Sequence, residues 1–128
     1  MTNENKNAIR GFKDLHVWQD AHALVLLIYK ATRSFPKEEQ FGLTSQLRRA
    51  ASSVTANIAE GSGRFHYKER IRFYHQARGS LVEVENHVIL SKDLAFLSQK
   101  ETDEILSLCS TVAKQLNGLI KATGKQID

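Results

Sequence analysis

Apolar residues recur at the three- and four-residue spacing of amphipathic helices in four separate segments of the chain. The spacing predicts a first helix over about residues 14–34, with Pro36 after its end, and a second over about 38–60, ended by Gly61 and Gly63. A third and longest helix is predicted over 66–95, and a fourth after the turn-like stretch LSQKETD, through 105–123. The residues predicted to face the core are Trp18, Ala21, Val25, Ile28 and Thr32; Leu43, Leu47, Ala50, Val54 and Ile58; Tyr74, Ala77, Leu81, Val84, Val88 and Ala95; and Ile105, Leu108, Cys109, Val112, Leu116, Leu119, Ile120 and Thr123.

No strand periodicity, internal repeat or low-complexity tract competes with this pattern. A chain of 128 residues corresponds to about one domain. Short connections between helices favour neighbours that run in opposite directions, so we expect an all-α fold, an antiparallel up-down four-helix bundle. The predicted domain spans residues 12–123, between an N-terminal tail at 1–11 and a C-terminal tail at 124–128.

The second predicted helix has small residues on the side opposite its apolar stripe. Ser52, Ala56 and Ala59 fall there at about 100° per residue, and Gly79 likewise points away from the core stripe of the third helix. A glycine inside a helix costs about 1 kcal/mol relative to alanine, so close approach of another surface would explain it. These four residues are a candidate interface in a homo-oligomer. The alternative is that the small residues are tolerated in a solvated helix and that Gly79 contacts a neighbouring helix of the same bundle.

A row of polar residues follows one edge of the second helix at helical spacing. Its members are Gln46, Arg49, Ser53, Asn57 and Glu60. Ser80 and Glu83 of the third helix are candidate partners, since a buried Asn57 needs a hydrogen bond and Arg49 pairs well with a carboxylate. We interpret this row as a structural polar seam rather than a catalytic constellation.

Positive charge is concentrated in the middle of the chain. The protein has 18 Lys and Arg residues against 14 Asp and Glu residues, a net charge of +4 and a pI near 9.3. Residues 45–78 contain seven basic and two acidic residues, and Phe65, Tyr67, Phe73 and Tyr74 lie among them. Such a patch can bind phosphates and stack bases, although ordinary solvated helix faces with inward aromatic residues would give the same composition.

Four of these cations are expected to point outward and to contact phosphates. They are Arg48, Arg64, Lys68 and Arg72. Arg49 and Arg78 are assigned instead to the polar seam. No residue pattern that reads base edges is present, so RNA or DNA binding with weak sequence preference is expected.

Catalytic and metal-binding signatures are mostly absent from the sequence, and no enzyme activity, cofactor or metal is expected. Glu-x-x-His pairs, HExxH, the Walker motif and the dinucleotide-binding glycine pattern do not occur. His66 and Glu69 stand one helical turn apart, where capping is a better explanation than metal ligation. Arg70 and His75 form an R-x4-H pattern similar to that of HEPN ribonucleases, but Ile71 replaces the expected polar residue, so ribonuclease activity is the minor alternative.

Cysteine content and hydropathy indicate a soluble protein of the cytoplasm. Cys109 is the single cysteine and lies on an apolar stripe, which predicts a buried thiol and excludes an internal disulfide. The longest apolar run, LVLLIY, is far shorter than the roughly 20 residues of a membrane span, and the N-terminus lacks the apolar core of a signal peptide.

Three stretches carry a resemblance to a known family. They are FKDLHVWQDA at 12–21, FPKEEQFGLTSQLRRAASSVTANIAEGSGR at 35–64 and ERIRFYHQARGSLVEVE at 69–85, with NIAEG at 57–61 and Gly79, Ser80 and Glu83 as the most diagnostic residues. The chain resembles, over about residues 12–122, the four-helix-bundle proteins encoded in intervening sequences of bacterial 23S ribosomal RNA, which are related to the accessory variability determinant (Avd) proteins of diversity-generating retroelements. His66 stands where the family usually has Ser or Thr, which weakens a capping box with Glu69.

The resemblance implies an up-down bundle, a homopentamer and a nucleic-acid partner, with a reverse transcriptase as partner only in the retroelement relatives. Three hypotheses remain. A nucleic-acid-binding oligomer is favoured, a protein-interaction scaffold is second, and a nuclease is third.

Overall fold

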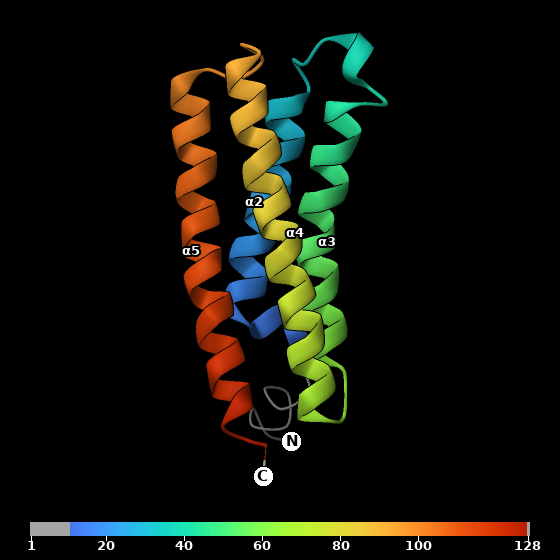
Figure 1. The fold of residues 1–128 in the computed structure, drawn as a ribbon, viewed down its shortest axis with the longest axis vertical. Coiled ribbons are helices and arrows are strands. Elements are labelled where there is room, and N and C mark those ends of the chain that lie inside the picture. The colour runs from blue at the N-terminus through green and yellow to red at the C-terminus, as the bar shows by residue number, and fades with distance from the viewer. Residues whose placement is uncertain (1–10, 128) are drawn as a thin grey trace, which may run out of the picture.

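The structure is a computed structural model that describes residues 11–127. Four α-helices dominate it, and the described residues contain no strand. The elements are η1 (Gly11–Asp14), α2 (His16–Thr32), η2 (Lys37–Glu39), α3 (Leu43–Ser62), α4 (Tyr67–Asp93) and α5 (Gln99–Gly124). The helices run alternately up and down, and the two described chain ends lie at the same end of the bundle as the α3–α4 turn (Figure 1). The predicted all-helical fold with four helices is thus confirmed; of the predicted N-terminal tail, residues 1–10 lie outside the described residues and Gly11 belongs to η1.

One face of each helix supplies a continuous core, as predicted for α3. Of the stripe predicted for α5, Leu108, Leu119 and Ile120 are only half-buried at its margin. The fully buried larger side chains are Leu24, Ile28, Leu47, Val54, Ile58, Leu81, Val84, Val88, Ile105, Cys109, Val112 and Leu116. Burial raises the pKa of the Cys109 thiol to about 12, and the negative charge of Glu85 acts in the same direction. Within residues 11–127, none of the helices combines the length and the apolar composition that a membrane span needs.

The predicted core position of Trp18 is only partly correct, because the half-buried side chain packs against the margin of the core. The stripe of α2 is centred on Val17, Leu24 and Ile28, and since each residue turns the helix by about 100°, Trp18 falls at its margin. Its half-buried ring stacks on His22, with ring centroids 4.8 Å apart. Val25 is half-buried for the same reason.

Several helix ends differ from the sequence prediction. Helix α3 begins at Leu43 rather than near residue 38, and Lys37–Glu39 form the separate short helix η2. Helix α4 ends at Asp93, and Ala95, predicted to be in the core, is exposed with φ 65°, while Ser91 takes the buried position. Helix α5 begins within the stretch predicted as a turn, because the Ser98 hydroxyl accepts from the Glu101 amide and the Glu101 carboxylate accepts from the Ser98 amide. This S-x-x-E capping box was the sequence signal for the helix start.

Gly61 brings α3 and α4 together and does not end α3 as predicted. The helix continues to Ser62, and Gly63 is its C-cap. A Cβ at Gly61 would lie 2.7 Å from Tyr74 Cε1 and 3.1 Å from the carbonyl oxygen of Arg70, so only glycine fits between the helices. The Ser62 hydroxyl is 3.2 Å from the Tyr74 hydroxyl and adds a polar contact at the same level.

The Gly61→Ala variant is therefore expected to lower the free energy of unfolding by about 1–3 kcal/mol, because the methyl group overpacks the contact with Tyr74. Gly63→Ala is the matched control, since its Cβ would meet nothing closer than 3.6 Å. Urea denaturation at fixed protein concentration measures both. Equal stabilities of the two variants would contradict the close contact.

Candidate functional site

The two ends of the bundle carry different charge. Residues 11–21, 57–72 and 119–127, which form the end with the α3–α4 turn, contain seven basic and four acidic residues. Residues 27–48 and 88–104, which form the opposite end, contain six of each, and we call this set the electroneutral end. The basic residues of the first set are Lys13, Arg64, Lys68, Arg70, Arg72, Lys121 and Lys125. We call this set the basic end.

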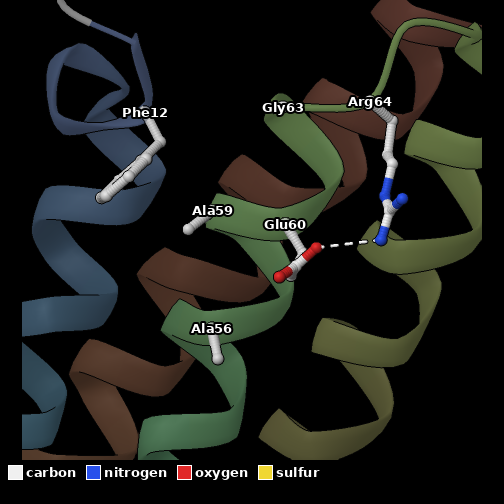
Figure 2. A pocket seen from close by; sticks show the side chains of 6 residues that line it. All are labelled: Phe12, Ala56, Ala59, Glu60, Gly63 and Arg64. Carbon is white, nitrogen blue, oxygen red and sulfur yellow. Dashed lines mark hydrogen bonds and ion pairs between the residues drawn. The ribbon is translucent and has the colours of Figure 1, made fainter.

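The α3–α4 turn at the basic end is held by backbone and arginine contacts. The Arg64 amide donates to the Gly61 carbonyl at 3.1 Å, and Arg70 Nε donates to the Arg64 carbonyl at 2.7 Å. The Arg64 guanidinium pairs with Glu60 at 3.0 Å, as Figure 2 shows, and lies 4.8 Å from the centre of the Phe73 ring. Arg64 is thus a half-buried, partly neutralised cation rather than a free one.

Lys68 and Arg72 match the sequence prediction of outward cations most closely. Both are exposed on α4 and stand four residues apart, which places their Cβ atoms about 5–6 Å apart on one helix face. Arg72 lies 5.7 Å from the Phe73 ring centre, and within residues 11–127 neither side chain forms an ion pair. Their charge is available to an external anion.

Two other arginines are placed differently from their prediction. Arg48 is not outward, because its Nε donates to the Thr32 hydroxyl at 2.9 Å and its guanidinium lies over the Tyr29 ring at 4.6 Å, both on α2. Arg78 does not join the α3–α4 seam, because it donates to Asn117 of α5 at 2.9 Å. Helical angle alone did not show that long side chains at stripe edges fold back onto the adjacent helix.

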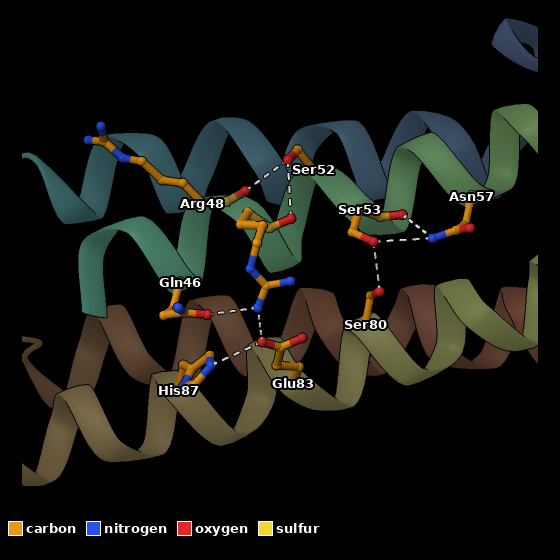
Figure 3. Close-up of polar contacts among 9 residues, drawn as sticks. Gln46, Arg48, Ser52, Ser53, Asn57, Ser80, Glu83 and His87 are labelled. Atoms are coloured by element: carbon orange, nitrogen blue, oxygen red, sulfur yellow. Dashed lines mark hydrogen bonds and ion pairs between the residues drawn. The ribbon is translucent and has the colours of Figure 1, made fainter. Parts of the chain in front are cut away.

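Most residues of the polar seam are brought together between α3 and α4 (Figure 3). Ser53 and Ser80 hydroxyls are 2.9 Å apart, and Asn57 donates to the Ser53 carbonyl at 2.9 Å. Farther along, Arg49 pairs with Glu83. The same guanidinium donates to Gln46 at 2.8 Å, and Glu83 also contacts His87 at 3.3 Å, a member that the sequence pattern did not indicate. Glu60 pairs with Arg64 instead of an α4 residue.

The small residues of the candidate interface lie on outer surfaces. Ser52 and Ala56 are exposed and Ala59 is half-buried, beside a shallow hollow that reaches Phe12 (Figure 2). Gly79 is exposed, and a Cβ there would meet nothing within 4 Å. Contact with a helix of the same bundle therefore does not explain this glycine.

An apolar line continues from Gly79 along α4. Val82 and Ile89 are 59% and 50% exposed, and they follow Gly79 at spacings of three and ten residues. These spacings keep all three residues on the far side of the core stripe. The signal in the sequence is a second apolar line on α4 that is turned away from the stripe facing the core.

The residues considered for capping, metal binding or catalysis do not come together in one site. His66 is the N-cap residue of α4 and makes no side-chain capping bond. Arg70 donates from its Nε to the Arg64 carbonyl in the α3–α4 turn, whereas the His75 ring nitrogen Nδ1 lies 2.9 Å from the Arg78 guanidinium. Among residues 11–127, no group of three or more His, Cys, Asp and Glu side chains is placed to hold a metal ion.

Three lysines at the basic end were not predicted from the sequence. Lys13 lies in η1, Lys121 in the last turn of α5 and Lys125 at its C-cap. They are distant in sequence from the 45–78 segment, but the up-down topology brings them to the end of the bundle that contains the α3–α4 turn (Figure 1). The predicted topology was itself the signal that could have found them.

Comparison with known proteins identifies related chains. A family model described as 23S rRNA-intervening sequence protein matches residues 13–118. The fold is similar to a crystal structure of a protein of unknown function from the S23 ribosomal protein family of Bacteroides thetaiotaomicron. The TM-score is 0.74 at 20% identity, with 82% of this chain and 98% of that chain covered. No curated protein matches the chain.

The Arg49–Glu83 pair is expected to stabilise the fold only weakly. The two side chains are 54% and 34% exposed, so water screens their attraction. A double-mutant cycle with Arg49→Ala and Glu83→Ala, read by urea denaturation, should give a coupling energy below about 1 kcal/mol. A coupling well above that value would show that the seam contributes much more than its exposure allows.

Proposed function

Because the chain belongs to the 23S rRNA-intervening sequence protein family, we propose that it is a non-enzymatic, basic, oligomeric bundle that binds nucleic acid through backbone phosphates. The observation that carries the proposal is the basic end, where Lys68 and Arg72 are exposed and not neutralised by carboxylates of the described chain. Phosphate contacts by such cations give affinity with little sequence preference.

Assembly is the second part of the proposal. The candidate interface consists of Ser52, Ala56, Ala59 and Gly79, and the family resemblance favours a homopentamer related to the Avd proteins. A symmetric ring repeats the basic end in every subunit. Linked weak sites raise the overall affinity by about 10² to 10⁴ when one polyanion spans them, so a modest charge per subunit suffices.

Binding rather than catalysis is favoured by the contacts of the candidate nuclease residues. Arg70 is tied to the α3–α4 turn by its Nε, and His75 is paired with Arg78, so each has a structural partner of its own. We place the protein in the cytoplasm, since a single buried cysteine suits a reducing compartment.

A protein-interaction scaffold is the second candidate, and the exposed apolar line on α4 favours it. Val82 and Ile89 lie on the outer face of the helix beyond Gly79. A protein partner, such as a reverse transcriptase for a retroelement accessory subunit, would cover these side chains. Binding that does not depend on salt would support this role over nucleic-acid binding.

Reversing the charge of Lys68 and Arg72 together, as Lys68→Glu and Arg72→Glu, is expected to weaken binding to all sequences alike. Each phosphate that the variant no longer neutralises should reduce the steepness of log affinity against log salt by about 0.7 to 0.9. Lys92→Glu with Lys100→Glu is the matched control, because it makes the same change in net charge at the other end of the bundle. Fluorescence anisotropy over a salt series measures both. If the two double variants bind alike, the basic end is not the phosphate site.

The Ala56→Trp variant is expected to disrupt assembly and leave the helices formed, since a large side chain at an exposed small position blocks close approach. Lys114→Trp on the exposed side of α5 is the control. Sedimentation velocity gives the oligomeric state, and circular dichroism gives the helix content. A wild-type protein that sediments as a monomer at micromolar concentration would contradict the assembly.

A further inference from the structure

Phe65 is a large apolar side chain placed in water at the basic end. Its exposed fraction is 87%, and it lies between α3 and α4 beside Arg64. Exposing a phenylalanine to this extent gives almost no packing within the chain. Phe65 therefore stands out as a side chain available to a ligand.

The segment around Phe65 is held in place before any ligand binds. The carbonyl of Arg64 accepts from Arg70 Nε at 2.7 Å, and the Arg64 amide is bonded to Gly61. On the other side of Phe65, the His66 carbonyl accepts from the Arg70 amide at 3.1 Å, and the His66 ring contacts the Phe65 ring edge-to-face at 5.1 Å. A ring on an anchored backbone loses less entropy when it stacks on a flat partner.

Cations lie near Phe65 along the chain, and their charge indicates the chemistry of the partner. Arg64 precedes it, and Lys68 and Arg72 follow within two turns of α4. An apolar protein partner would leave these charges desolvated, whereas a nucleic-acid strand offers both phosphates for the cations and flat bases for the ring. A base inside a duplex is stacked on its neighbours, so only an unpaired base has a free face.

We propose that Phe65 stacks on an unpaired base of a nucleic-acid strand whose phosphates lie along Lys68 and Arg72. The inference rests on the proposed function and deepens it, because it selects single-stranded or loop regions over duplexes. The phosphate contacts alone would bind both forms. Phe65 then provides a preference for single strands over duplexes. It does not distinguish between bases, since every base has a stacking face.

The test uses a single-stranded RNA oligonucleotide containing 2-aminopurine and a duplex of the same length. Base–aromatic stacking predicts that Phe65→Ala weakens single-strand binding about five- to 150-fold and removes the quenching of 2-aminopurine, with duplex affinity unchanged. Phe65→Trp should retain both properties. Phe41→Ala is the matched control, because Phe41 is 89% exposed at the electroneutral end.

The outcomes separate this inference from the proposed function. If Phe65→Ala binds and quenches as the wild type does while Lys68→Glu with Arg72→Glu weakens binding, stacking is wrong and phosphate binding stands. If the wild-type protein binds neither RNA form, both proposals fail. If Phe65→Ala changes the sedimentation of the free protein, Phe65 belongs to a subunit interface, and the stacking proposal is overturned.

Discussion

The absence of a side chain at Gly61 is the constraint on which the candidate site depends. It lets α3 and α4 approach until the Tyr74 ring lies against the glycine, and the Ser62 and Tyr74 hydroxyls meet at 3.2 Å beside it. Helix α3 ends one residue later, and Arg70 of α4 reaches the turn to bind the Arg64 carbonyl. This packing gives Arg64, Phe65 and the first turns of α4 defined positions. A looser contact would leave the basic end without a fixed shape.

The order of the helices brings further basic residues to the α3–α4 turn. In an up-down bundle, α2 begins and α5 ends beside the α3–α4 turn, so Lys13, Lys121 and Lys125 join the cations of α4. The opposite end carries equal numbers of basic and acidic residues, which makes the bundle electrostatically polar along its axis. Such polarity favours binding of a polyanion at the basic end over the opposite end.

The fold was largely predictable from the sequence, because helical periodicity is a local property that packing reinforced. Errors arose where side-chain size or reach decided the outcome. Trp18 fell at the edge of its stripe, and Arg48 turned back onto Thr32 and Tyr29 although its helical angle pointed outward. The gathering of seam residues between α3 and α4 followed from spacing, but Asn57 donates to Ser53 and not to the expected Ser80 or Glu83. The anchoring of the α3–α4 turn by Arg70 could not be predicted, because the sequence does not show which carbonyl a long side chain reaches.

The central claim is that nucleic acid binds at the basic end. Ultraviolet cross-linking of the protein to single-stranded RNA, followed by mass spectrometry of the peptides, tests this claim most directly. We expect cross-links concentrated in residues 64–73, where Phe65 and Tyr67 lie beside the cations, with fewer on η1 and the end of α5. Cross-links concentrated in residues 27–48 or 88–104, at the electroneutral end, would contradict it.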